Sequence, residues 1–286
     1  MIDQRPPVWM VRRSFATYGG GMVPVSFALA PHVGSVIDYD SDRGEPGVHI
    51  GMPSTSLTLI FAVGDPLDVA WAGRPQTRAR FWAHLSGLHS RPAEIRHDGR
   101  MRGVQVDLGL SGARALLGVP AGELSGKLVE AGDIDPQLAS LPERLAGAPR
   151  TRWAGLVQAA LITALARHDL PGPRAEVGRS LAQLTRGHHV QAVADEVGFS
   201  RRHLTDLVRA ECGLSPKQFQ RIARFQRAHR LVRAGRPLAA IAVECGYADQ
   251  AHLTRDWTAL AGCSPRTWMH RELSFVQDSP IVSDDN

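Results

Sequence analysis

The stretch ECGYADQAHLTRDW (residues 244–257) contains a pattern that the chain carries twice, since EVGFSRRHLTDLV (residues 196–208) is nearly the same phrase. Each stretch has a glycine followed by an aromatic residue, and then the triplet His-Leu-Thr. Glycine permits the positive φ that a tight turn between two helices demands. Ser200 in the first stretch and Asp249 in the second stand where a helix N-cap is expected. A helix, a short glycine-containing turn and a second helix together indicate a helix-turn-helix unit, written twice.

The two units can be aligned residue by residue. We call the repeat that begins at Val190 unit one and the repeat that begins at Leu238 unit two. In the second helix of each unit, apolar residues recur on one face and are expected in the core: Leu204, Leu207, Val208, Leu253, Trp257 and Leu260. The opposite face carries Arg202, Thr205, Asp206 and Arg209 in unit one, and Gln250, Ala251, Thr254, Arg255 and Thr258 in unit two. Arg and Gln on such a face are suited to base edges in a major groove, although a solvated face is the alternative.

Between the units, residues 215–235 lack a helix breaker after Pro216 and predict one continuous helix of about five turns. Arginines recur there at every third residue, so they spiral around the helix instead of forming one stripe. Residues 201–236 hold ten basic residues against two acidic ones. Such a concentration of positive charge suits a polyanion such as DNA, or else forms a solvated helix face.

The first 170 residues read mainly as strands. In residues 103–110, Val104, Val106, Leu108 and Leu110 alternate with polar residues or glycine, which predicts a strand with one buried face. Short strands separated by turn residues indicate a small antiparallel barrel or sandwich. Further strands are expected at 33–39, 56–63 and 80–85. We also expect a short helix that is capped by Ser111 and a longer helix at 151–168.

The sequence therefore predicts an α+β chain of two domains. Residues 1–170 are expected to form a small β-barrel or sandwich-like domain with a few helices, for sensing or dimerisation. The stretch 171–177 is expected to be a linker, because two prolines and a glycine fall within it. Residues 178–273 are expected to form an all-α domain of two helix-turn-helix units joined by a linker helix, and 274–286 a flexible tail.

Composition excludes several classes of protein. No run of about eighteen apolar residues exists, so no transmembrane helix and no membrane partner are expected. The N-terminus lacks the pattern of a secretory signal, and three cysteines without a CxxC pair fit a reducing cytoplasm. We find no phosphate loop, Gly-x-Ser-x-Gly elbow or HExxH motif, and expect no catalytic residue, metal or cofactor. Trp71, Phe81 and Trp82 fit either an apolar ligand cavity or an ordinary core.

Over about residues 178–271, the two units and their joining helix resemble the AraC/XylS family of transcription regulators. The signature stretch is AAIAVECGYADQAHLTRDWTALAGCSPRTW. The phrases PSTSLTLIFAVGDP and GVQVDLGLSGARALLGVPAGEL resemble, more weakly, the β-rich N-terminal domain of an actinobacterial-type branch. The resemblance implies a bacterial, cytoplasmic regulator whose two recognition helices enter successive major-groove segments of double-stranded promoter or operator DNA.

The resemblance also implies which residues read bases: Arg202, Thr205 and Asp206 in unit one, and Gln250, Ala251, His252 and Arg255 in unit two. Asp206 departs from the family, in which many members have a basic or amide side chain. An aspartate can accept a hydrogen bond from cytosine N4, or it can pair with Arg202 or Arg209. A small-molecule effector of the N-terminal domain, RNA polymerase and a second copy of the chain are further candidate partners.

Two other functions stay open at this stage. One is a barrel-type enzyme that carries a DNA-binding appendage, which needs a convergent acid/base or metal cluster in residues 1–170. The other is an architectural DNA-binding protein with a dimerisation domain and no ligand. Stabilisation of residues 1–170 by a ligand would disfavour the architectural protein.

Overall fold

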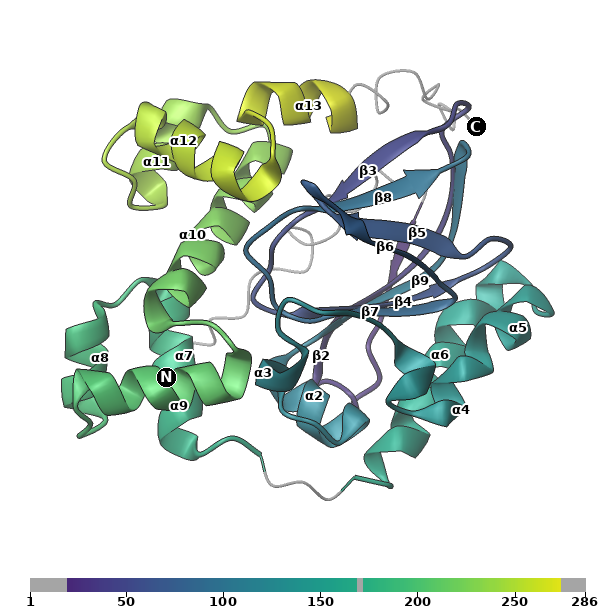
Figure 1. Cartoon of the computed structure of the whole chain (residues 1–286), viewed down its shortest axis with the longest axis horizontal. Helices are drawn as coiled ribbons and strands as arrows, with labels where there is room; N and C mark the ends of the chain where they lie inside the picture. Colours follow the sequence, from purple (N-terminus) through teal and green to yellow (C-terminus); the bar gives the residue numbers. More distant parts are fainter. Residues whose placement is uncertain (1–19, 169–171, 274–286) are drawn as a thin grey trace, which may run out of the picture.

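The computed structural model describes residues 20–168 and 172–273, and it has a β-rich half and a helical half (Figure 1). This arrangement confirms the expected α+β organisation. The expected flexible tail, residues 274–286, lies outside the described residues. No helix among the described residues is long and apolar enough to cross a membrane.

The strands of the first half form two antiparallel sheets. A six-stranded sheet has the order β1-β2-β9-β4-β7-β10, and a four-stranded sheet has the order β3-β8-β5-β6. The described strands do not close into a barrel, so the sandwich-like alternative is the one that the chain adopts. The strands are β1 (Gly21–Val23), β2 (Val33–Asp42), β3 (Gly47–Gly51), β4 (Leu57–Ala62), β5 (Leu67–Trp71), β6 (Arg74–Phe81), β7 (Ala83–Ser86), β8 (Ala93–His97), β9 (Arg100–Leu108) and β10 (Leu128–Glu130).

The alternation of apolar and polar residues along the strands determines which side chains are buried in the core. In β9, Val104, Val106 and Leu108 are fully buried, as their period of two predicts. The same expectation for Leu110 is wrong, because β9 ends at Leu108 and Leu110 starts the helix that follows. Trp71 and Phe81 belong to a smaller apolar cluster that draws on both sheets, so they serve as core. The expected strand at 80–85 is wrong as one element, because β6 ends at Phe81 and β7 starts at Ala83. Trp82 interrupts the two strands and leaves 46% of its surface exposed.

Short helices cover one side of the β-rich half (Figure 1). They are α2 (Leu110–Leu117), α3 (Ala121–Leu124), α4 (Pro136–Ala139), α5 (Leu141–Ala146) and α6 (Trp153–Leu165), with 3-10 turns at Ala131–Asp133 and Arg150–Arg152. Ser111 does not cap α2 as expected, since its hydroxyl donates to the carbonyl of Pro31 and the cap position is Gly109. The longer helix expected at 151–168 is α6.

The helical half contains seven helices among its described residues: α7 (Ala175–Arg186), α8 (Val190–Glu196), α9 (Arg201–Cys212), α10 (Pro216–Arg233), α11 (Leu238–Glu244), α12 (Gln250–Ala261) and α13 (Pro265–Leu273). Residues 175–177 were expected in the linker, but they are helical because α7 begins at Ala175. Helix α10 is the continuous helix that the sequence predicts. Its start is fixed by a capping box, in which Ser215 and Gln218 satisfy each other's backbone N–H groups.

One apolar core runs through both halves. The same cluster of buried side chains contains Leu29 and Phe61 of the β-rich half and Leu204 and Trp257 of the helical half. The halves are therefore packed against each other, and α9 and α10 both contact the β-rich half.

Candidate nucleic-acid interface

The turns of the two units share one geometry. Gly198 has a φ of 72° and Gly246 a φ of 73°, in the left-handed region that favours glycine. The aromatic residue after each glycine packs against the histidine of the following helix. The ring of Phe199 meets His203 edge-on at 4.9 Å, and Tyr247 meets His252 in the same way at 5.2 Å between centroids. The histidine of each His-Leu-Thr triplet therefore packs against the turn of its own unit.

The second helix of each unit begins at the expected cap. The Ser200 hydroxyl accepts the backbone N–H of His203 at 3.2 Å, and an Asp249 carboxylate oxygen accepts that of His252 at 2.6 Å. Each cap satisfies one N–H group that a helix start would leave unpaired. The caps set where α9 and α12 begin, and so which side chains face outward from their first turns.

The inner faces of α9 and α12 agree with the sequence prediction, with one partial exception. Leu204, Val208, Leu253, Trp257 and Leu260 are fully buried. Leu207 is only half-buried and packs at the edge of the core.

The outer face of α9 carries the expected residues of unit one. Arg202, Asp206 and Arg209 are exposed, and Thr205 is half-buried with its hydroxyl donating to the carbonyl of Arg201. With Arg201, these residues line an open depression of about 600 Å³. A helix that displays cationic side chains around such a depression can approach a polyanion closely.

Asp206 lies among arginines without joining them. In the described part of the chain, no ion pair within 4.0 Å links Asp206 to Arg202 or Arg209. The pairing that the sequence left open is therefore absent from this structure. The carboxylate of Asp206 is available as an acceptor on the outer face.

The outer face of α12 carries Gln250, Ala251 and Arg255, all exposed. His252 is half-buried, and its Nδ1 accepts the backbone N–H of Ala248 at 3.3 Å. Its ring is therefore held by the turn, with less freedom than its exposed neighbours have. The structure thus brings Gln250, Ala251 and Arg255 together on one exposed surface, and it places His252 at the edge of that surface.

Arginines of α10 hold the helical half together. Arg221 Nε donates to Asp256 Oδ1 at 2.5 Å, and Arg224 Nη2 lies 3.4 Å from Asp256 Oδ2. Arg224 also stacks over the Tyr247 ring, 4.3 Å from its centroid. Arg227 donates to the carbonyl of Thr185. These side chains bind other residues of the chain. Fewer positive charges of this segment are therefore available to a ligand than its count of basic residues suggests.

Sequence reasoning did not single out Asp256, which is buried in α12. The alignment of the units places it opposite Leu207, so a carboxylate occupies an apolar position of the repeat. The aspartate at this apolar position could have identified the site from the sequence, because a buried carboxylate needs a cationic partner.

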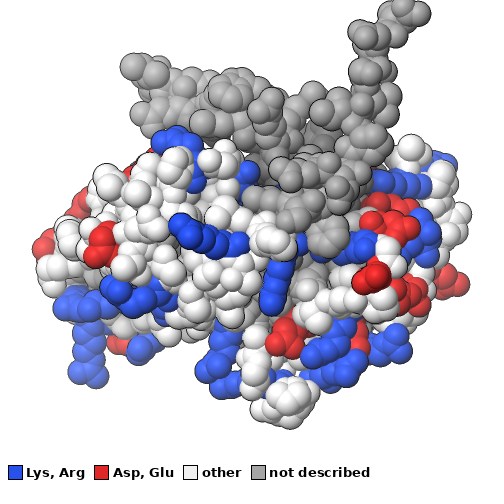
Figure 2. All heavy atoms as spheres, turned by 90° about the horizontal axis from the view of Figure 1, so that it is seen from above, with Lys and Arg blue, Asp and Glu red and all other residues white. Residues whose placement is uncertain are grey.

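Basic residues gather on the surface of the helical half. Figure 2 shows one face, on which Lys and Arg side chains project at the edge of the helical half on the left. Acidic side chains are also visible on that side, and on the β-rich half, on the right, acidic and basic side chains are interspersed.

The described residues contain no cluster of metal-binding side chains, and the thiols of Cys212 and Cys245 are unreactive. No group of three or more His, Cys, Asp or Glu side chains in this part of the chain could hold a metal ion. Burial raises the pKa of the Cys212 thiol to about 11, and burial also raises the pKa of Cys245. Both side chains stay protonated thiols at neutral pH, which makes them poor nucleophiles.

Comparisons with known proteins agree with this geometry. A family model described as a helix-turn-helix domain matches residues 193–271. An apo variant of ToxT from Vibrio cholerae strain SCE256 is similar in structure, with a TM-score of 0.54 and 9% identity over 83% of this chain and 97% of that chain. Wild-type ToxT from the same strain, bound to an unsaturated fatty acid, has a TM-score of 0.50 and 10% identity over 88% of this chain and 99% of that chain.

A DNA-binding transcriptional dual regulator from Escherichia coli K-12 is 24% identical over 36% of this chain and 99% of that chain, with a TM-score of 0.30. A search of curated proteins found no match. The ToxT structures show that the two halves together follow a known fold.

Proposed function

Residues 193–271 form a helix-turn-helix domain of the AraC type, and from this premise we propose that the chain is a sequence-specific, DNA-binding transcription regulator. In this proposal α9 and α12 read successive major-groove segments on one face of the DNA. The observation that carries it is the pair of matched units, each with the same turn, a capped second helix and an exposed polar face.

The exposed side chains of Gln250, Ala251 and Arg255 in unit two can each be matched to one kind of base. Arg255 can donate two hydrogen bonds to guanine, Gln250 can pair with adenine, and the methyl group of Ala251 can contact thymine. His252, at the edge of this surface, is assigned to a phosphate.

Unit one reads with a different set. Arg202 takes a guanine edge, Thr205 contacts an adjacent base, and Asp206 accepts from a cytosine N4 amino group. Arg209, further along the exposed face, is assigned to the phosphate backbone. The carboxylate of Asp206 suits this role because no cationic side chain in the described residues holds it.

We propose residues 1–170 as the regulatory domain and residues 178–273 as the DNA-binding domain of a bacterial, cytoplasmic protein. The ToxT structure that contains an unsaturated fatty acid supports a small apolar molecule as the effector. RNA polymerase and a second copy of the chain are the further partners that a transcription regulator of this kind would engage.

The test is a selection of genomic DNA fragments on the purified full chain, followed by fluorescence anisotropy across a range of salt concentrations. Arg255→Ala and Gln250→Ala should each weaken binding to an enriched fragment by about 1–3 kcal/mol and relax the preference at one base. Arg80→Ala, which removes an exposed arginine of β6, is the matched control and should bind as the wild type does.

Weak, sequence-blind binding that ignores Arg255→Ala and Gln250→Ala would contradict the proposal and leave an architectural DNA binder. The effector is tested separately by thermal unfolding of the full chain with and without oleate, an unsaturated fatty acid. A bound effector raises the unfolding temperature as its concentration rises, whereas no shift argues against an effector of this class.

A further inference from the structure

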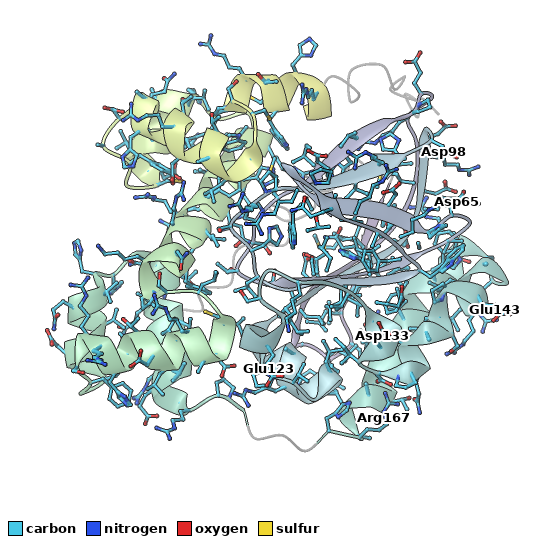
Figure 3. The ribbon with its side chains drawn as sticks, in the orientation of Figure 1. Asp65, Asp98, Glu123, Asp133, Glu143 and Arg167 are labelled. Carbon is cyan, nitrogen blue, oxygen red and sulfur yellow. The ribbon has the colours of Figure 1, made fainter. Side chains whose placement is uncertain are left out.

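The β-rich half packs closely against the C-terminal end of α9. Helix α3 lies against the C-terminal part of α9, and Figure 3 labels Glu123 of α3 at this junction. Gly122 faces the α9 backbone so closely that a Cβ atom there would lie 2.5 Å from the carbonyl oxygen of Ala210. Just beyond α9, a Cβ on Gly213 would lie 2.1 Å from the Cβ of Ser125. Two glycines thus allow α3 and the segment after it to touch the main chain of unit one.

An ion pair reinforces this contact. Arg114 of α2 donates from Nη2 to Glu211 Oε2 at 2.9 Å and from Nε to Glu211 Oε1 at 3.3 Å. The side chain of Glu211 is 5% exposed and that of Arg114 is 21% exposed. A carboxylate near a helix C-terminus meets the negative end of the helix dipole, so Glu211 depends on Arg114 for its charge to be compensated. We call Arg114, Gly122, Ser125, Ala210, Glu211 and Gly213 the clasp.

The second recognition helix is held from a different place. The buried carboxylate of α12, Asp256, pairs with Arg221 and Arg224 of α10, within the helical half itself. The β-rich half does approach the end of α12, where a Cβ on Gly262 would lie 3.3 Å from Pro92 Cγ. That approach is tighter than an ordinary van der Waals contact but looser than those at Gly122 and Gly213, and it lacks the charge pairing that the clasp has.

The β-rich half also contacts α10, since the hydroxyl and the backbone N–H of Thr55 both donate to Gln226 Oε1. It therefore holds α9 and the linker helix at the same time. A shift of α2 and α3 relative to this anchor would move the end of α9 with respect to α10. The Asp256 ion pairs would keep α12 in place on α10.

We propose that the β-rich half controls DNA recognition through unit one, by way of the clasp, while unit two keeps the orientation that α10 gives it. This inference rests on the proposed function and adds which of the two reading helices responds to the N-terminal domain. Unit two anchors the chain on its DNA, and unit one supplies the part of the base preference that the N-terminal domain can alter.

The test loosens the clasp from the N-terminal side, without touching either reading face. Gly122→Ala places a methyl group against the α9 backbone, whereas Gly155→Ala in α6 meets no atom within 4 Å and is the matched control. The probe is a DNA fragment enriched by the wild-type chain, with each base pair replaced in turn. The variants Arg202→Ala and Arg255→Ala assign the sensitive base pairs to unit one and unit two.

Gly122→Ala should change the base preference at the unit-one positions by on the order of tenfold and leave the unit-two positions unchanged. Gly155→Ala should reproduce the wild-type profile at both sets of positions. Arg114→Gln and Glu211→Gln should each act like Gly122→Ala, and their combination should add little, because both remove one interaction. The exchange Arg114→Glu with Glu211→Arg should restore much of the wild-type profile, which a purely local defect in α9 would not allow.

Equal changes at both sets of positions in the clasp variants, or no change at either set, would overturn the inference. Circular dichroism melts of the same samples verify that each variant is folded at the temperature of the binding assay. A wild-type chain without any base preference would instead overturn the proposed function, and the inference with it. The two failures are distinguishable because the second one appears before any variant is made.

Discussion

The two helix-turn-helix units share a phrase of sequence but are supported differently. In unit one, Glu211 lies near the end of α9, and its carboxylate is held by Arg114 of the β-rich half. In unit two, Asp256 stands at the position that matches Leu207, and it is held by Arg221 and Arg224 of the linker helix. The repeat therefore fixes the shape of a unit, and a single carboxylate at an otherwise apolar position of the repeat decides what each unit is attached to.

This difference carries over to the aromatic core. Trp257 occupies the place that Val208 has in unit one, and its ring lies edge-on to Phe225 at 5.1 Å and to Trp268 at 5.8 Å. Unit two is thus tied to α10 and α13 by large buried rings as well as by ion pairs. A rigid attachment of unit two to α10 is the physical counterpart of the role that we propose for it.

The largest effect is expected from removing this aromatic anchor. Trp257→Ala should lower the free energy of unfolding by about 3–5 kcal/mol, because the side chain is fully buried and leaves a cavity. Val208→Ala removes far fewer buried atoms at the matching position of unit one and should cost much less. Chemical denaturation of the two variants measures the contrast, and equal losses would mean that the units are anchored alike.

The next effect concerns the buried carboxylate of α12. Asp256→Asn should cost about 2 kcal/mol of stability, which is less than for a fully buried pair, since the side chains of Arg221 and Arg224 are 39% and 29% exposed. Glu244→Gln is the control in the same unit, because its ion pair with Arg236 is exposed and should contribute less than about 1 kcal/mol. If both variants unfold at the wild-type denaturant concentration, Asp256 does not anchor α12.

The helix caps allow the two units to be compared at one position each. Ser200→Ala and Asp249→Ala should each destabilise the chain by about 1 kcal/mol. Asp249→Ala should cost the more of the two, because a carboxylate also interacts with the positive end of the helix dipole. Thermal melts at low and high salt check this, since only the Asp249 contribution should shrink with salt.

Asp206 is expected to give the smallest effect, in base preference and not in stability. Asp206→Asn keeps an acceptor and adds an amide donor, so preference at one unit-one position should move from cytosine toward adenine by about threefold. Binding titrations on fragments that differ only at that base pair measure the shift. A uniform gain in affinity for all fragments would show instead that Asp206 only repels phosphates.

The features that follow from local chemistry were predictable from the sequence. Residues only a few positions apart determine the turn glycines and the caps Ser200 and Asp249. They also determine the spacing of the buried residues along α9 and α12. The strand break at Trp82 and the missing cap at Ser111 were not predictable, because strand pairing and the carbonyl of Pro31 decide them.

The long-range ion pairs were also beyond the sequence. Nothing in the pattern around Glu211 indicates Arg114, which lies 97 residues away along the chain. The repeat does mark both carboxylates, since Asp256 aligns with Leu207 and Glu211 aligns with Leu260, and a carboxylate at an apolar position signals a partner without identifying it. Base-reading assignments for unit one and unit two remain predictions, because they depend on a nucleic acid that the fold alone does not supply.

The glycine contacts of the clasp have a consequence for how such a chain can be recombined. Gly122 lets α3 lie against the backbone of α9, and Gly213 leaves room for the Ser125 side chain, at distances that a side chain on either glycine would prevent. A foreign sensor with a larger residue at the place of Gly122 would not fit the end of α9, and a foreign DNA-binding half without a carboxylate at the place of Glu211 would leave Arg114 unpaired. Exchange of parts between proteins of this architecture should therefore succeed only when the α2–α3 corner travels with the first helix-turn-helix unit, which makes the exchangeable module larger than either half.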